Sequence, residues 1–269
     1  MSNRFSFCVA ACLILFSLAP LRAFSGNELA DWGVTDSSGT IDLNAAELQD
    51  SIITVSLKNK SSEMITAVAV SFKEDVYHYQ DWLNAEPSGL APGQTFEITV
   101  GADEGVNRKI RIAAVLFDDG SGKGDPDQLD LMNFHRFGQI LEGTRVRDIL
   151  RTRNATLDDA VLSALAQKIG KMPLSSEDAF LSLAEVNIPG IPLADLKRSS
   201  EKKRNALFWG VSTARERALR QIENVKHLPT VSSDEKAPSR TVVLSFLQAQ
   251  YDSQNKKAAA LLARIQGGR

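Results

Sequence analysis

The stretch KIRIAAVLFDDGSGKGDP, from Lys109 to Pro126, joins two kinds of sequence. Its first half, Lys109–Phe117, is rich in β-branched and aliphatic residues, which is typical of a strand with buried side chains. Its second half carries glycines among aspartates and ends in Asp125-Pro126, an N-cap carboxylate followed by proline at the first helical position. The stretch therefore predicts the last strand of a β-rich segment, a reversal of the chain and the start of a helical segment.

The glycine-rich half admits two further interpretations, a phosphate loop and a calcium loop. A phosphate loop needs the order G-x-x-x-x-G-K-[ST], whereas here Lys123 is followed by Gly124. A calcium loop would place Lys123 where an oxygen ligand is required. Its oxygen ligands would be Asp119, Ser121, Asp127 and Asp130. These four remain a calcium candidate, and the favoured interpretation is a corner between sheet and helix.

Short apolar segments without helical periodicity precede this stretch. They are Thr40–Leu43, Ser51–Lys58, Met64–Phe72 and Phe96–Val100. Within the second segment Ile53, Val55 and Leu57 alternate onto one face, as in a half-buried strand. Short strands separated by turn residues favour an antiparallel β-sandwich over alternating strands and helices.

The segment Ser51–Asp125 resembles small immunoglobulin-like modules of secreted bacterial envelope proteins. Three features carry the resemblance: a strand ending in K-N-x-S at Lys58–Ser61, a following strand of small and branched residues, and an L-x-P-G-x turn at Leu90–Gln94. The resemblance implies an immunoglobulin-like β-sandwich with a structural or adhesive role, and it implies no catalytic residue.

Helical periodicity dominates the chain from Pro126 onward. It predicts helices that begin at Pro126 and at Thr156–Asp159, and three more over 176–186, 192–226 and 240–266. The predicted fold class is therefore α+β, with the sandwich followed by an all-α region. The predicted divisions are a signal peptide over residues 1–25, the sandwich over 26–125 and the helical region over 126–269, with a linker over 227–239.

The first residues have the pattern of a secretory signal peptide. Arg4 precedes the charge-free, mostly apolar stretch Phe5–Leu21, and small residues at Ala23 and Ser25 follow it. Both cysteines, Cys8 and Cys12, lie in this leader. We therefore expect a secreted or periplasmic mature chain without disulfides, and no other stretch is apolar enough to predict a transmembrane helix.

Charge divides the chain, although the net charge of the whole is only −2. Acidic residues are in excess over 26–126 and basic residues over 127–269. Six basic side chains form candidates for binding an anionic partner: Arg145, Arg147, Arg151, Lys202, Lys203 and Arg204. The alternatives are a solvated helical face and docking of the basic helices on the acidic half of the same chain.

Aromatic residues gather in Asp75–Trp82. Tyr77, His78, Tyr79 and Trp82 are candidates for binding a sugar or a peptide, because rings offer contact area at low entropic cost. The alternative is a strand edge or crossover whose rings cover one end of the sandwich.

These observations predict an exported, non-catalytic protein that binds or scaffolds at the cell envelope or outside it. Its partner would be an envelope protein or polysaccharide, or an anionic surface recognised by the basic helices. Export argues against nucleic acid as a partner, and no cofactor or catalytic residue is assigned. The rival hypothesis is an enzyme whose site lies between the two halves, built from His78, His135, Asp118 and Asp119.

Overall fold

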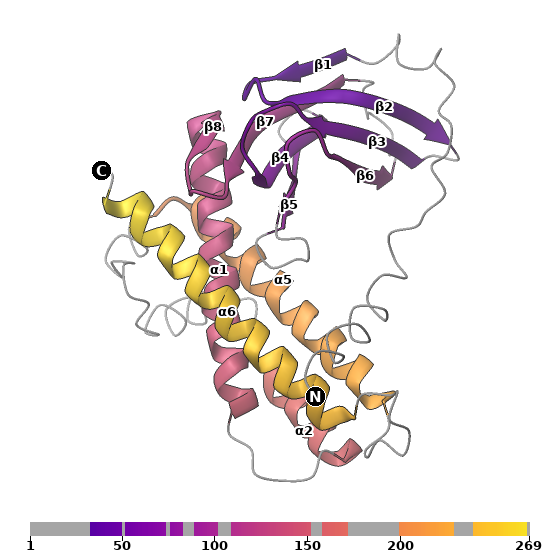
Figure 1. Cartoon of the computed structure of the whole chain (residues 1–269), viewed down its shortest axis with the longest axis vertical. Helices are drawn as coiled ribbons and strands as arrows, with labels where there is room; N and C mark the ends of the chain where they lie inside the picture. Colours follow the sequence, from indigo (N-terminus) through magenta and orange to yellow (C-terminus); the bar gives the residue numbers. More distant parts are fainter. Residues whose placement is uncertain are drawn as a thin grey trace, which may run out of the picture.

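The computed structural model describes residues 33–49, 52–73, 76–82, 89–101, 109–151, 158–171, 199–228 and 239–267. The predicted signal peptide, both cysteines and the predicted helix over 176–186 lie outside these ranges. Within them the fold is α+β, with two open β-sheets at one end of the molecule and long helices extending from them (Figure 1).

The larger sheet, sheet A, has the order β1-β7-β4-β5, with the short β8 also paired to β7. Its strands are β1 (Gly33–Asp36), β4 (Ile65–Lys73), β5 (Val76–Asp81), β7 (Lys109–Phe117) and β8 (Gly122–Gly124). The smaller sheet, sheet B, has the order β2-β3-β6. Its strands are β2 (Ile41–Gln49), β3 (Ile52–Asn59) and β6 (Thr95–Gly101). Neighbouring strands pair antiparallel, except that β1 runs parallel to β7.

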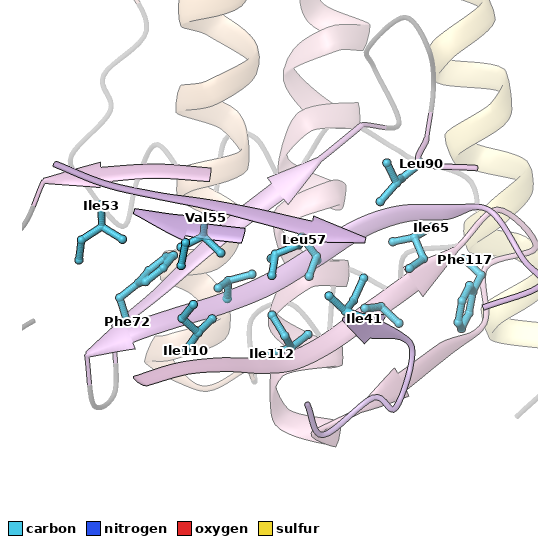
Figure 2. Close-up of a cluster of buried hydrophobic side chains, with 14 residues drawn as sticks. Ile41, Ile53, Val55, Leu57, Ile65, Phe72, Leu90, Ile110, Ile112 and Phe117 are labelled. Atoms are coloured by element: carbon cyan, nitrogen blue, oxygen red, sulfur yellow. The ribbon is translucent and has the colours of Figure 1, made fainter. Parts of the chain in front are cut away.

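One apolar core lies between the two sheets (Figure 2). Sheet B contributes the alternating residues Ile53, Val55 and Leu57 of β3, all of which are buried as predicted. Sheet A contributes branched and aromatic side chains of β4 and β7, among them Ile112 and Phe117. Burying such side chains stabilises the fold by about 1.5–3 kcal/mol each, relative to leaving them exposed.

The K-N-x-S motif organises one end of this core. Asn59 is completely buried, and its amide nitrogen donates 2.9 Å hydrogen bonds to the carbonyl oxygens of Glu63 and Leu90. Its side-chain oxygen accepts from the backbone nitrogen and the hydroxyl of Ser61. The backbone of Asn59 also pairs with Gly93 and Gln94. One asparagine therefore joins the β3–β4 connection to the L-x-P-G-x turn.

The stretch that follows β7 turns a corner, as predicted. Gly120 has a φ of +91° in the turn after β7, and β8 returns alongside the second half of β7. Gly124 has a φ of +118°, and a Cβ there would collide with the backbone of Ala113 and Ala114. The carboxylate of Asp125 accepts from the backbone nitrogen of Asp127 at 3.0 Å, which caps the next helix.

Four helices are described: α1 (Pro126–Arg151), α2 (Asp159–Gly170), α5 (Glu201–Lys226) and α6 (Arg240–Gly267). The four helices share one apolar core, which we name cluster B. It holds side chains from all four helices, including Leu150, Ile169, Ile222 and Leu247. The ion pairs Asp130–Lys203 and Glu142–Arg215 are ordered alike along α1 and α5, so these two helices run in the same direction.

One predicted helix boundary is wrong. The helix expected over 192–226 begins at Glu201, because Ser200 is extended and its hydroxyl accepts from the backbone nitrogen of Lys203. Its predicted apolar stripe is confirmed: the side chains of Leu207, Val211, Ala214, Ala218, Ile222 and Val225 are buried. Strands β1 and β8 were not predicted, since they are short and their contacts with neighbouring strands supply most of their stabilisation. Strand β5 lies at the edge of sheet A, in agreement with the alternative interpretation of Asp75–Trp82.

Candidate functional site

Helix α1 packs both on sheet A and in the core that the helices share. Its first half lies on the outer face of sheet A, where Leu129 and Met132 contact small residues of β4 and β7. These small residues are Ala67, Ala69, Ala113 and Ala114. Its second half lies in cluster B with the other helices. We name the region where α1 meets β5 and α5 the junction, and it holds most of the buried polar side chains of the helices.

A buried ion pair joins α1 to β5 in the junction. Arg136 donates through Nε to Asp81 Oδ2 at 2.8 Å and through Nη2 to Asp81 Oδ1 at 3.3 Å. The side chains are only 2% and 6% exposed, so both charges are removed from water. Nη2 also donates to the hydroxyl of Thr66 at 2.8 Å, which itself reaches the carbonyl oxygens at the end of β7. Such a pair holds its geometry firmly, since losing one partner would leave a buried charge uncompensated.

His135 lies next to this pair and stacks on β5. Its ring is 6.2 Å from the ring of Tyr79, with an interplanar angle of 25°. Gln139 Nε2 lies 3.2 Å from His135 Nδ1, and the Tyr79 hydroxyl donates to Gln128 at 2.8 Å. Burial lowers the pKa of His135 and raises the pKa of Tyr79 to about 12. Both rings are therefore uncharged at neutral pH.

A second charged group lies deeper among the helices. The carboxylate of Glu142 is fully buried and accepts from Arg145 of the same helix and from Arg215 of α5. Arg145 also donates to the carbonyl oxygen of Ile169 at the end of α2, at 2.9 Å. Glu142 thus ties three helices together through charge-assisted hydrogen bonds.

Perturbed side chains continue along α5 towards α6. Burial lowers the pKa of Arg217, and the nearby Tyr251 and Asp81 act in the opposite direction. Burial raises the pKa of Tyr251 to about 12, and its hydroxyl donates to Gln221 at 2.8 Å. Perturbed titratable groups that gather in one place mark a candidate functional site, although structural ion pairs produce the same effect.

The chemistry available to the junction is limited by its internal contacts. His135 Nδ1 is used by Gln139, and among the described residues no serine, threonine or cysteine hydrogen-bonds to this ring. The carboxylates of Asp81 and Glu142 both face arginines. A nucleophile and base in hydrogen-bond reach, the minimal arrangement for covalent catalysis, do not occur together in this part of the structure.

The predicted aromatic candidates do not form one surface. Because side chains alternate along a strand, Tyr77 and Tyr79 of β5 lie on the side that faces α1. His78 contacts the ring of Phe72, and Trp82 contacts the ring of Phe96 on the side of the inter-sheet core. Tyr77, Tyr79 and Trp82 are half-buried against neighbouring side chains, and His78 is exposed beside Phe72. This division between two faces matches the alternative interpretation of the segment more closely than a shared ligand surface.

The predicted anionic-partner residues are mostly engaged inside the chain. Arg147 and Arg151 lie within salt-bridge distance of Asp252 on α6, and Lys203 pairs with Asp130. Arg145 binds Glu142, and Arg204 donates to the carbonyl oxygen of Ser199 at 2.7 Å. Lys202 is exposed on the first turn of α5. Arg147, Arg151 and Lys203 thus pair with a neighbouring helix, and Arg145 pairs within α1. These basic residues balance acidic residues of the helical half itself.

The calcium candidates are likewise placed in other roles. Asp119 accepts from the backbone nitrogen of Ser121 in the turn, and Asp130 binds Lys203. Asp127 is exposed on the first turn of α1. Across the described ranges no three histidine, cysteine or acidic side chains gather as a metal ion would require.

The residues of the rival enzyme hypothesis are not brought together. His135 lies buried against Tyr79, whereas His78 is exposed and contacts Phe72. Asp118 and Asp119 are exposed in the turn after β7. Sequence reasoning missed the Arg136–Asp81 pair, and the available signal was an arginine within the apolar periodicity of a predicted helix.

Comparison with protein-family models, curated proteins and solved structures gives no match for this chain. None of the helices in the described part of the chain has the length and apolarity needed to cross a membrane.

Proposed function

We propose that this chain is an exported, non-catalytic binding or scaffolding protein of the cell envelope or the extracellular space. One observation carries the proposal: α1 packs both on the outer face of sheet A and in cluster B, and the titratable side chains that meet along it bind one another. An arrangement of this kind holds an acidic β half and a basic helical half in a fixed relation. This arrangement leaves no acid, base or nucleophile in the junction free to react.

We further propose that the β half is an immunoglobulin-like sandwich. The pairing of β2 with β3 and of β3 with β6 corresponds to strands A, B and E of that fold. The pairing of β5, β4, β7 and β8 corresponds to its second sheet, with β8 as a shortened last strand. This correspondence supports the predicted resemblance and the structural or adhesive role that it implies.

The test of export is the mass of the mature protein isolated from the producing cell. Cleavage after Ala23 or Ser25 would leave a chain that begins at Phe24 or Gly26. A full-length chain retained in the cytoplasm would contradict the proposal.

The test of binding is retention of the chain from Gly26 on isolated envelope membranes, on peptidoglycan and on vesicles of anionic or neutral lipid. We expect retention on at least one envelope fraction that persists at high salt, because the basic side chains are mostly paired internally. No retention on any fraction would contradict the proposal. If the chain hydrolysed a substrate from a panel of hydrolase substrates, and H135F abolished that activity, the result would favour the enzyme hypothesis instead.

A further inference from the structure

His135 occupies a contact point of three elements. Its ring stacks on Tyr79 of β5, and its backbone carbonyl lies against Gly210 of α5. The residue is only 7% exposed. Any change in the size or charge of this ring therefore affects the contact between sheet A and the helices.

The ring is held in its neutral form by its hydrogen bond. The Gln139 amide is oriented with Nε2, a donor, 3.2 Å from His135 Nδ1, which fits a ring whose Nδ1 carries no proton and accepts this bond. A proton on Nδ1 would place two donors face to face. Protonation thus breaks this hydrogen bond as the structure arranges it, and the Gln139 amide must turn to present Oε1 before it can bind the charged ring.

The charges around the ring act in both directions on its protonation. Asp81 of β5 favours a positive ring, but Arg136 binds both oxygens of this carboxylate. Arg136 of α1 and Arg217 of α5 repel a positive ring, and Tyr79 is uncharged. Burial contributes the largest effect on the pKa of His135 and lowers it below the ordinary value.

We propose that His135 is an acid-sensitive latch between α1 and β5: its protonation separates the first half of α1 from β5 and from the outer face of sheet A. The inference does not depend on the proposed scaffold role. It adds a condition under which the two halves of the molecule come apart, while the core between the two sheets stays closed.

The direction of the pH effect follows from linkage. In the open form the ring meets water and regains the ordinary histidine pKa of about 6.5. The open form then binds more protons than the closed form as the pH falls through that value, so acid favours opening. Above a pH of about 6.5 His135 is neutral in both the open and the closed form, and the latch is closed.

Cysteine labelling tests the latch, because the chain from Gly26 contains no native cysteine. A69C places a thiol between sheet A and α1, and V55C places one between the two sheets. The labelling rate of A69C divided by that of V55C, measured at pH 7.5 and pH 5.5, cancels the pH dependence of the thiol itself. We expect this ratio to rise several-fold at pH 5.5 in the otherwise native protein. A114C, on β7 at the same interface, replaces A69C if that variant does not fold.

Variants of the histidines test whether His135 causes the rise of this labelling ratio at acid pH. H135F keeps a ring against Tyr79 but cannot be protonated, and H135Q provides a second uncharged residue. Both should hold the ratio constant with pH, whereas H227Q, which alters an exposed histidine at the end of α5, should behave like the native protein. An equal rise for A69C and V55C, or a rise that persists in both His135 variants, would overturn the proposal.

Discussion

Asn59 shows how a single polar residue can fix a β connection. It is fully buried, and its side chain satisfies groups on both the β3–β4 connection and the turn at Leu90. The Lys-Asn-Lys-Ser pattern therefore has a local physical cause, since glutamine would reach too far and aspartate could not donate.

Replacing this asparagine should be costly. N59A removes the hydrogen bonds that the side chain donates to the carbonyl oxygens of Glu63 and Leu90 and accepts from Ser61, and each contributes about 0.5–1.5 kcal/mol. We expect the free energy of unfolding, measured by urea denaturation, to fall by about 2–4 kcal/mol. S62A is the control, because Ser62 is exposed in the same β3–β4 connection, and its replacement should change stability by less than about 0.5 kcal/mol.

Arg136 gives a second prediction at this scale. R136M removes the cation and leaves Asp81 in a buried site, which typically costs about 3–5 kcal/mol of stability. The double variant R136M/D81L should restore a large part of this loss, since apolar replacement of a buried ion pair is often neutral. Equal stability of the single and double variants in urea denaturation would contradict this account.

Among the helices, the closest approach is the crossing of α1 and α5. Gly138 lies against the backbone of Leu207 and Val211, and Gly210 lies against that of His135 and Gln139. A Cβ at either glycine would collide with a carbonyl oxygen of the opposite helix. Because the backbone cannot move aside as a flexible side chain can, the two helices must separate or shift to make room for a Cβ.

We expect G138A and G210A each to destabilise the protein by at least about 1–3 kcal/mol, the usual cost of overpacking. G170A is the control: Gly170 ends α2 with nothing near its Cβ, and alanine favours the helix by up to about 1 kcal/mol. Thermal unfolding followed by circular dichroism measures all three. If the melting temperatures of G138A and G210A equalled that of the native chain, α1 and α5 would be less tightly packed than the structure shows.

For the whole molecule, the shared helix predicts cooperative unfolding at neutral pH. Since α1 contributes to the contacts on sheet A and to cluster B, unfolding of either half exposes apolar surface of the other when the latch is closed. Trp82 reports on the sheets through its contact with Phe96, and Trp209 on α5 is 70% exposed and reports on the helices.

Variants that retain only one of these two tryptophans separate the signals. In each, the other two of the three tryptophans are changed to phenylalanine. We expect the two fluorescence transitions in urea to coincide at pH 7.5. Midpoints that differ by more than the error of the measurement would show two independently folding units.

Part of the candidate site was open to prediction. The aromatic residues of β5 and His135 were recognised as candidates, but their partners were not. Asp81 and Arg136 are 55 residues apart in the chain, and neither strand pairing nor helical periodicity relates one to the other. The basic residues were similarly visible, whereas their ion pairs with Asp130, Glu142 and Asp252 required the helices to be in place.

The sequence by itself determined the local structure: strands where β-branched residues alternate, a capped helix start at Asp125-Pro126, and apolar stripes that are buried along α5. These features depend on residues close together in the chain, whose preferences act before any packing. Only the tertiary structure decided that α1 joins the outer face of sheet A to cluster B, that Gly138 and Gly210 face each other's helices, and that the charges of the junction neutralise one another. Burial and Coulomb forces act through space, so they select partners that no spacing along the chain can specify.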